Sequence, residues 1–207
     1  MEHTETRGLR FCKNALNGGT QAGGNKMNGK KLWNIFRDYM EYFLVYAIIG
    51  WVYESVWCCM IYHHRGFINR GYLFGPWLPI YGVGFFVILG IFTLLKVKKP
   101  VWVFVVGTVV ATLAELIASY IIEATIGERM WDYTGYFLNF EGRIALVPDL
   151  MFGLMIFVAM CLIQPGLKKL QNKFRDSKPH NIGFIIITAL FMIDLIARIW
   201  LGSNYKG

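Results

Sequence analysis

The sequence predicts an all-α protein, a polytopic membrane helix bundle with about five transmembrane helices and two irregular outer loops. Hydrophobic residues make up 56% of the 207 residues, and aromatic residues 16%. The mean hydropathy is positive, at +0.43. Apolar runs recur along the chain, and a helix can cross lipid because it satisfies its backbone hydrogen bonds within one segment. We therefore expect a transmembrane helical domain over residues 41–203.

The N-terminal residues differ from this domain. Residues 1–30 are polar and rich in Gly and Asn, and they contain no apolar core of a signal peptide, so we expect a disordered polar tail. Residues 31–40 mix apolar side chains such as Trp33 with charged ones such as Arg37. This mixture is typical of a short amphipathic helix lying in the membrane interface.

Five apolar runs are long enough to span a bilayer. We expect spans near residues 41–61, 77–95, 101–124, 144–163 and 182–201. Acidic residues interrupt four of them: Glu54, then Glu115 with Glu123, then Asp149, then Asp194. Charges inside a membrane are costly and need partners or a function. Asp194 precedes Arg198 by four residues, so we expect an ion pair along that helix.

The basic residues orient the chain. Most of them lie in residues 7–37, 96–99 and 168–178, and fewer lie in residues 65–70 and 129–143. The positive-inside rule then places the N-terminus in the cytoplasm and the C-terminus outside the cell membrane. Because the net charge of +8 follows this topology pattern, we expect a lipid bilayer and not nucleic acid as the partner. With this orientation the acidic residues of the spans fall in the outer half of the bilayer.

Neither a metal site nor a cofactor is predicted. The chain has four cysteines, which lack the spacing of a zinc site: Cys12, Cys58, Cys59 and Cys161. The pair His63 and His64 has no identifiable third ligand. Gly19 and Gly24 have part of the spacing of a phosphate-binding loop, but no lysine follows at the required position.

The third predicted span carries a polar stripe. Its members recur at intervals of three or four residues and therefore share one helical face: Thr108, Thr112, Glu115, Ser119 and Glu123. In lipid such a face must lie against protein or water. The stripe fits either a packing seam with neutral acids or the wall of a functional polar cavity.

The two outer loops are unusual in composition. Residues 66–82 contain four glycines and two prolines, which favour tight turns and close backbone approach. Residues 127–143 combine acids, arginines and aromatic side chains. Aromatic residues at this depth also fit an interfacial belt, so composition alone does not decide between a belt and a site.

Several short motifs in these segments form a set. They are Gly50-Trp51-x-x-Glu54, Asn69-Arg70-Gly71-Tyr72-Leu73, Glu115-Leu116-x-x-Ser119, Trp131-Asp132-Tyr133 and Asn139-x-x-Gly142-Arg143. Over roughly residues 41–165 the chain resembles a bacterial family named Putative ABC-transporter type IV, or ABC-transporter permease-like membrane proteins. The resemblance implies a permease subunit that would need a separate ATPase subunit for any use of ATP. Asp149 is a departure, because a serine is expected there.

The motif positions are the candidate substrate-binding residues: Glu54, Asn69, Arg70, Glu115, Ser119, Trp131, Asp132, Asn139 and Arg143. We expect a permease-like protein that binds a small polar or amphipathic solute in the outer half of the bilayer. Arg70 and Arg143 would hold an anionic group, and Glu54 and Glu115 would balance charge. No catalytic residue is assigned, and five spans are few for a complete pathway, so we expect a homo-oligomer.

Two alternatives stay open. The first is a membrane-embedded enzyme acting on a lipid or its headgroup, in which the arginines would hold phosphate and an acid would act as general base. The second is a non-catalytic membrane scaffold, whose charges only fix the packing of its helices.

Overall fold

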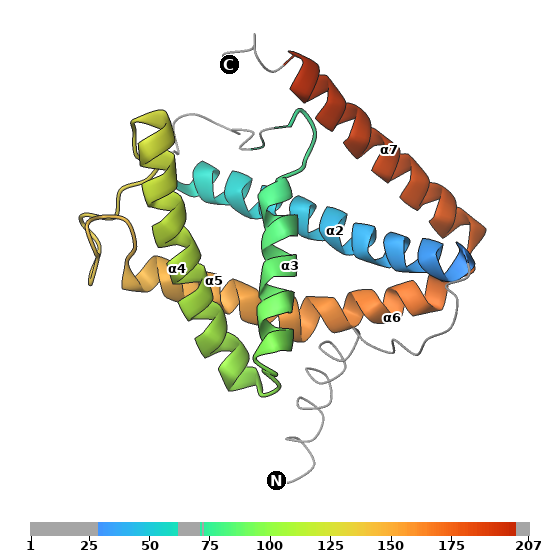
Figure 1. Cartoon of the computed structure of the whole chain (residues 1–207), viewed down its shortest axis with the longest axis horizontal. Coiled ribbons are helices and arrows are strands. Elements are labelled where there is room, and N and C mark those ends of the chain that lie inside the picture. The colour runs from blue at the N-terminus through green and yellow to red at the C-terminus, as the bar shows by residue number, and fades with distance from the viewer. Residues whose placement is uncertain (1–28, 62–70, 72, 202–207) are drawn as a thin grey trace. The chain divides into compact units, whose positions relative to one another are not determined.

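The computed structural model describes residues 29–61, 71 and 73–201 (Figure 1). Every regular element among them is a helix: α2 (Gly29–Ile61), α3 (Pro79–Leu94), α4 (Pro100–Ile126), α5 (Leu146–Val158), the π-helical turn η1 (Ala159–Ile163), α6 (Gln164–Phe174) and α7 (Lys178–Leu201). The predicted all-α class is confirmed. Residues 1–28 of the predicted polar tail and the candidates Asn69 and Arg70 lie outside the described residues, whereas residues 29 and 30 of that tail begin α2.

The helices have the lengths and composition of a multi-pass membrane protein. Among the described residues, three helical stretches are long and apolar enough to cross a membrane: Pro100–Ile126, Leu146–Phe174 and Lys178–Leu201. The apolar helix α3 is shorter, with 16 residues. With α2, which contains the first predicted span, these stretches agree with the expected number of about five.

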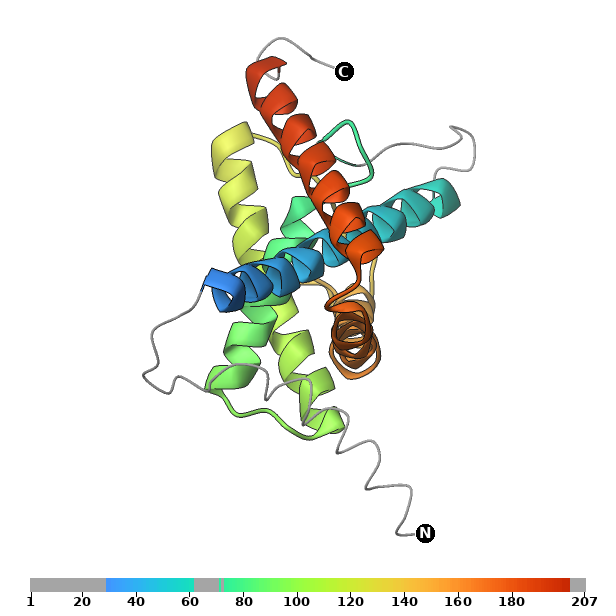
Figure 2. The same cartoon turned by 90° about the vertical axis from the view of Figure 1, so that its right-hand side faces the viewer.

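Helix α2 is longer than either segment predicted for that region. Its 33 residues include both 31–40 and 41–61, and Figure 2 shows it as one unbroken helix. No glycine or proline occurs between Lys30 and Ile49, so nothing in the sequence ends a helix near residue 40. The placement of residues 31–40 in the membrane interface stays a prediction.

The fourth predicted span also continues further than expected. Helix α5 passes through η1 into α6, so the helical path reaches Phe174 instead of ending near residue 163. Pro165 is the second residue of α6, two positions after the end of η1. A proline in a helix removes one hydrogen bond and crowds the carbonyl four residues earlier, and the wider π turn provides room for it.

The described chain divides into two compact units. The first comprises residues 88–169, and the second comprises residues 29–87 with 170–201. In the first unit α4 packs against α5. Gly107 faces Ile156, and Gly153 lies so close to Thr108 that a Cβ at residue 153 would overlap the threonine side chain. Small residues therefore allow α4 and α5 to approach closely.

The second unit has an aromatic core. Leu44, Leu73, Trp77 and Phe191 form a buried cluster. The rings of Trp77 and Phe191 meet edge to face, with centroids 5.7 Å apart. Gly50 on α2 lies against the Tyr81 ring, where a Cβ would not fit. Leu73, Trp77 and Tyr81 thus pack the start of α3 and the residues before it against α2.

Candidate functional site

Arg143 is the centre of a polar network in the first unit. Its side chain is only 6% exposed. Nη1 donates to Ser119 Oγ at 2.9 Å, Nη2 donates to the Glu123 carboxylate, and Nε donates to Glu141 Oε2 at 3.2 Å. The guanidinium also lies 3.9 Å from the centroid of the Tyr120 ring. Hydrogen bonds from Arg143 to Glu123 and Glu141 raise its pKa above the ordinary value.

Loop 127–145, which connects α4 to α5, is organised by its own hydrogen bonds. The indole Nε1 of Trp131 donates to the carbonyl of Arg143 at 2.9 Å. Asn139 Nδ2 donates to the carbonyls of Thr134 and Tyr136, each at 3.0 Å, and Asn139 Oδ1 accepts from Gly142 N at 3.2 Å. Trp131 and Asn139, both predicted to bind substrate, therefore hold loop 127–145 together.

The acids of loop 127–145 are also engaged within the chain. Asp132 accepts from the hydroxyl of Thr134 and from its backbone N–H, the latter at 2.9 Å, and these bonds lower the pKa of Asp132. Gly142 has φ 68°, and a Cβ there would meet Asp132 and Thr134. Glu141 accepts from Tyr120 Oη at 2.8 Å and from Arg143, and these bonds lower its pKa.

Glu115 lies in contact with the same loop. The hydroxyl of Tyr133 donates to Glu115 Oε1 at 2.9 Å. Asp149, in the first turn of α5, is 7% exposed, and its carboxyl group lies close to that of Glu115. Glu115 Oε2 and Asp149 Oδ1 are both buried and accept no hydrogen bond from an N–H or hydroxyl group of the described residues.

The polar stripe of α4 combines a packing seam with a polar site. Thr108 bonds back to the carbonyl of Phe104 at 2.9 Å and packs on Gly153, as in a packing seam. Ser119 instead contacts Arg143, and Glu115 contacts Tyr133 and Asp149. Thr112 lies beside Asp149, so the stripe takes part in a polar site from Thr112 onward.

The structure brings together Glu115, Ser119, Trp131, Asp132, Asn139 and Arg143 in one unit. Glu54 belongs to the second unit, where its Oε1 accepts from Tyr81 Oη at 2.7 Å. A single polar layer that includes Glu54 and Glu115 stays a prediction. The candidate list lacked Asp149, although an acid in an otherwise apolar span was the signal for it.

The predicted ion pair on α7 is wrong. Within the described residues, Asp194 forms no ion pair with Arg198; its carboxylate accepts from the backbone N–H groups of Phe74 at 3.0 Å and Gly75 at 2.7 Å. The Arg198 guanidinium lies 5.5 Å from the centroid of the Phe74 ring. The irregular backbone before α3 needs acceptors for its N–H groups, and a carboxylate is a strong one.

A second polar network, in the second unit, was not anticipated from the sequence. The sequence predicts Arg37 to be a topology-determining charge on an interfacial helix, yet its side chain is 1% exposed. Its Nη1 donates to the carbonyl of Arg175 at 2.9 Å and to the side-chain oxygen of Asn181. The Arg37 guanidinium also forms ion pairs with Asp38 at 3.6 Å and Glu41 at 3.7 Å.

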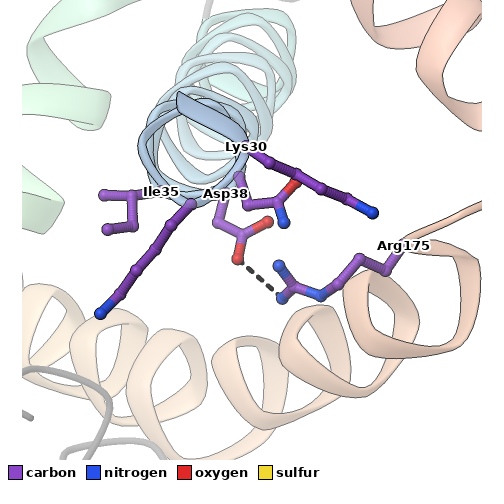
Figure 3. A pocket seen from close by; sticks show the side chains of 6 residues that line it. Lys30, Ile35, Asp38 and Arg175 are labelled. Carbon is purple, nitrogen blue, oxygen red and sulfur yellow. Dashed lines mark hydrogen bonds and ion pairs between the residues drawn. The ribbon is translucent and has the colours of Figure 1, made fainter. Parts of the chain in front are cut away.

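The same network joins α2 to the end of α6 and the start of α7. Gln171 Nε2 donates to Glu41 Oε2 at 2.9 Å, and His180 Nε2 lies 2.9 Å from Glu41 Oε1. Arg175 pairs with Asp38 at 2.8 Å. Beside this pair is an open pocket of about 400 Å³ (Figure 3), lined by Lys30, Lys31, Asn34, Ile35, Asp38 and Arg175.

A model of the family described as Putative ABC-transporter type IV matches residues 41–199. The chain belongs to this family. The Putative ABC-transporter type IV match extends beyond the resemblance seen in the motifs and includes the whole of loop 127–145 and most of α7. No curated protein and no solved structure matches the chain. Family and apolar helices together identify a multi-pass membrane protein related to transporters.

Proposed function

We propose that the chain is the permease-like, membrane-spanning subunit of a transport system in the cell membrane. Its N-terminus lies in the cytoplasm and its C-terminus outside, a homo-oligomer forms the pathway, and a separate ATPase subunit supplies any energy from ATP. Family membership and the long apolar helices support this proposal. The distribution of lysine and arginine between the connecting segments supports the orientation.

In this proposal the solute site lies where α4, α5 and loop 127–145 meet, in the outer half of the bilayer. The observation that carries it is that buried Asp149 lies close to half-buried Glu115, which contacts Tyr133. Paired carboxyl groups inside spanning helices are expensive unless a function retains them. Such a site suits a small polar or amphipathic solute.

The geometry changes the role expected for Arg143. Its donors are directed to Ser119, Glu123 and Glu141, so Arg143 holds loop 127–145 on α4 and is not an open anion clamp. Trp131, Asp132 and Asn139 act with it as positioning residues for the loop. Glu115 is then the group that faces the solute.

The internal pairing of the arginines also favours one alternative over the other. A lipid-modifying enzyme would use Arg70, Arg129 and Arg143 to hold phosphate, and Arg70 lies outside the described residues. Arg129 Nε donates to Glu123 at 3.2 Å and its Nη1 donates to the carbonyl of Glu141 at 2.8 Å, so Arg129 and Arg143 both already have partners. A non-catalytic scaffold is the alternative that this pairing supports.

Transport and scaffold roles can be separated in purified protein. We would reconstitute the chain in vesicles and measure uptake of labelled amino acids, quaternary amines and phosphate esters, with thermal unfolding in detergent as a binding assay. A permease should take up, and be stabilised by, at least one solute class, and Glu115→Ala should abolish both effects. The matched control is Glu128→Ala, since Glu128 is exposed in the loop. Uptake and stabilisation that survive Glu115→Ala would contradict the proposed site.

A further inference from the structure

We propose that Glu115 on α4 and Asp149 on α5 bind one proton between them, forming a proton-binding site inside the spanning helices. The inference rests on the proposed function and deepens it, because it names the proton as a ligand of that site. Glu115 Oε2 carries the proton and donates it in a hydrogen bond to Asp149 Oδ1. The pair then holds one negative charge instead of two.

Hydrogen bonding within the pair requires this proton. A carboxylate only accepts hydrogen bonds, so two ionised groups cannot be bonded to each other. The carboxyl groups of Glu115 and Asp149 nevertheless lie close to each other. Glu115 Oε2 and Asp149 Oδ1 receive no hydrogen from another described residue, and the side chain of Asp149 is more than nine-tenths buried. One proton between them satisfies both oxygens.

No positive side chain of the described residues neutralises the pair. Neither acid forms an ion pair with a described residue, and Arg143 directs its donors to Ser119, Glu123 and Glu141. In the part of the chain that the structure describes, the groups facing the pair are the Tyr133 hydroxyl from the loop and the Thr112 hydroxyl from α4, both uncharged. Two like charges in contact within a spanning segment strongly disfavour double ionisation.

The helix geometry indicates which acid keeps the charge. Asp149 lies in the first turn of α5, where the backbone N–H groups and the helix dipole favour a negative group. Glu115 lies mid-helix on α4 and accepts the Tyr133 hydroxyl through Oε1, which leaves Oε2 for the proton. The assignment is therefore Glu115 protonated and Asp149 ionised.

Tyr133 connects the proton to the position of loop 127–145. Its backbone N–H donates to the carbonyl of Gly142 at 2.8 Å, next to Arg143, while its hydroxyl holds Glu115. A displacement of the loop would remove a donor from Glu115 and change its affinity for the proton. By linkage, loss of the proton would change the stability of the closed loop by the same factor.

Infrared spectroscopy of the purified full chain in detergent at neutral pH tests the proposal. We would record the carbonyl stretching band of protonated carboxylic acids, as differences between the wild type and each variant. Glu115→Gln should remove a band that shifts on ¹³C labelling of glutamate but not of aspartate. Asp149→Asn and Tyr133→Phe should shift that band, since each changes a hydrogen-bonding partner of Glu115. Glu128→Gln should change nothing.

Size-exclusion chromatography shows whether each variant is folded. The amide variants should fold, because the amide N–H group can donate the hydrogen bond that the shared proton makes in the wild type. The proposal would be overturned if the difference spectrum between the wild type and Glu115→Gln showed no band of a protonated carboxylic acid. A band that neither Glu115→Gln nor Asp149→Asn alters would also overturn it. Stabilisation by Na⁺ without any such band would show that the pair binds a cation instead of a proton. The band needs no transported solute, so failed uptake with an intact band contradicts only the permease role.

Discussion

The two polar networks of this protein each surround a buried arginine but connect different parts of the chain. Arg143 binds carboxylates and a hydroxyl no more than 24 residues away in sequence and holds one loop on one helix. Arg37 binds the carbonyl of Arg175 and the side chain of Asn181, 138 and 144 residues away. The first network therefore controls local structure, whereas the second joins segments that only the fold brings together.

The largest expected effect is that of Arg37→Ala. The substitution leaves Asp38 and Glu41 without a buried cation and removes bonds to the α6–α7 segment, so we expect a loss of about 3–5 kcal/mol in unfolding free energy. Thermal unfolding in detergent measures it. Lys31→Ala on the exposed side of the same helix is the control and should change stability by about 0.5 kcal/mol or less. Equal melting temperatures for both variants would show that Arg37 does not join these segments.

Gly153→Ala should have the next largest effect. The added methyl group would overlap the Thr108 side chain between α4 and α5, at a cost of roughly 1–3 kcal/mol. Because Asp149 lies one turn before Gly153, the carboxyl band assigned to Glu115 should shift as well. Gly84→Ala on α3, where the methyl group meets open space, should be neutral or slightly stabilising. If both variants melt alike, close approach of α4 and α5 is not what Gly153 provides.

Arg143→Ala should have a smaller and strictly local effect. Loop 127–145 would lose its bonds to Ser119 and Glu123, so limited proteolysis and hydrogen exchange within the loop should accelerate. Exchange in α2 and α7 should stay unchanged. Arg143→Lys should restore only part of the protection, because an ammonium group cannot reproduce the guanidinium fork. Accelerated exchange throughout the chain would contradict the local role.

The smallest effect is a dependence of loop protection on pH. Hydrogen bonds lower the pKa of Asp132 and of Glu141, so the open loop binds more protons than the closed loop as the pH falls. The stabilisation of the closed loop by these two acids is fully present above the ordinary carboxyl pKa of about 4. It is lost as the pH falls through the lowered pKa values of Asp132 and Glu141. Hydrogen exchange in loop 127–145 measures it. Tyr120→Phe removes a donor to Glu141 and should weaken the dependence; an unchanged profile would argue against it.

Local sequence signals predicted some of these contacts and not others. The spacing of Glu115, Ser119 and Glu123 placed them on one helical face, and the structure keeps them there. The same reasoning failed for Asp194, because a favourable spacing to Arg198 says nothing about competing donors. The carboxylate of Asp194 instead accepts hydrogen bonds from the backbone N–H groups of Phe74 and Gly75, about 120 residues earlier in the chain.

The sequence by itself determined the helical membrane class, the family motifs and the polar face of α4, because hydropathy and helical periodicity act over one or two turns. Only the tertiary structure decided that Asp149 meets Glu115, that Arg37 is buried and that Arg143 is occupied by partners of its own chain. These pairings depend on how closely whole helices approach, which Gly107 and Gly153 permit for α4 and α5. Spacing along one helix predicts which residues share a face of it. A hydrogen bond between two helices also depends on where the second helix lies, which spacing does not give.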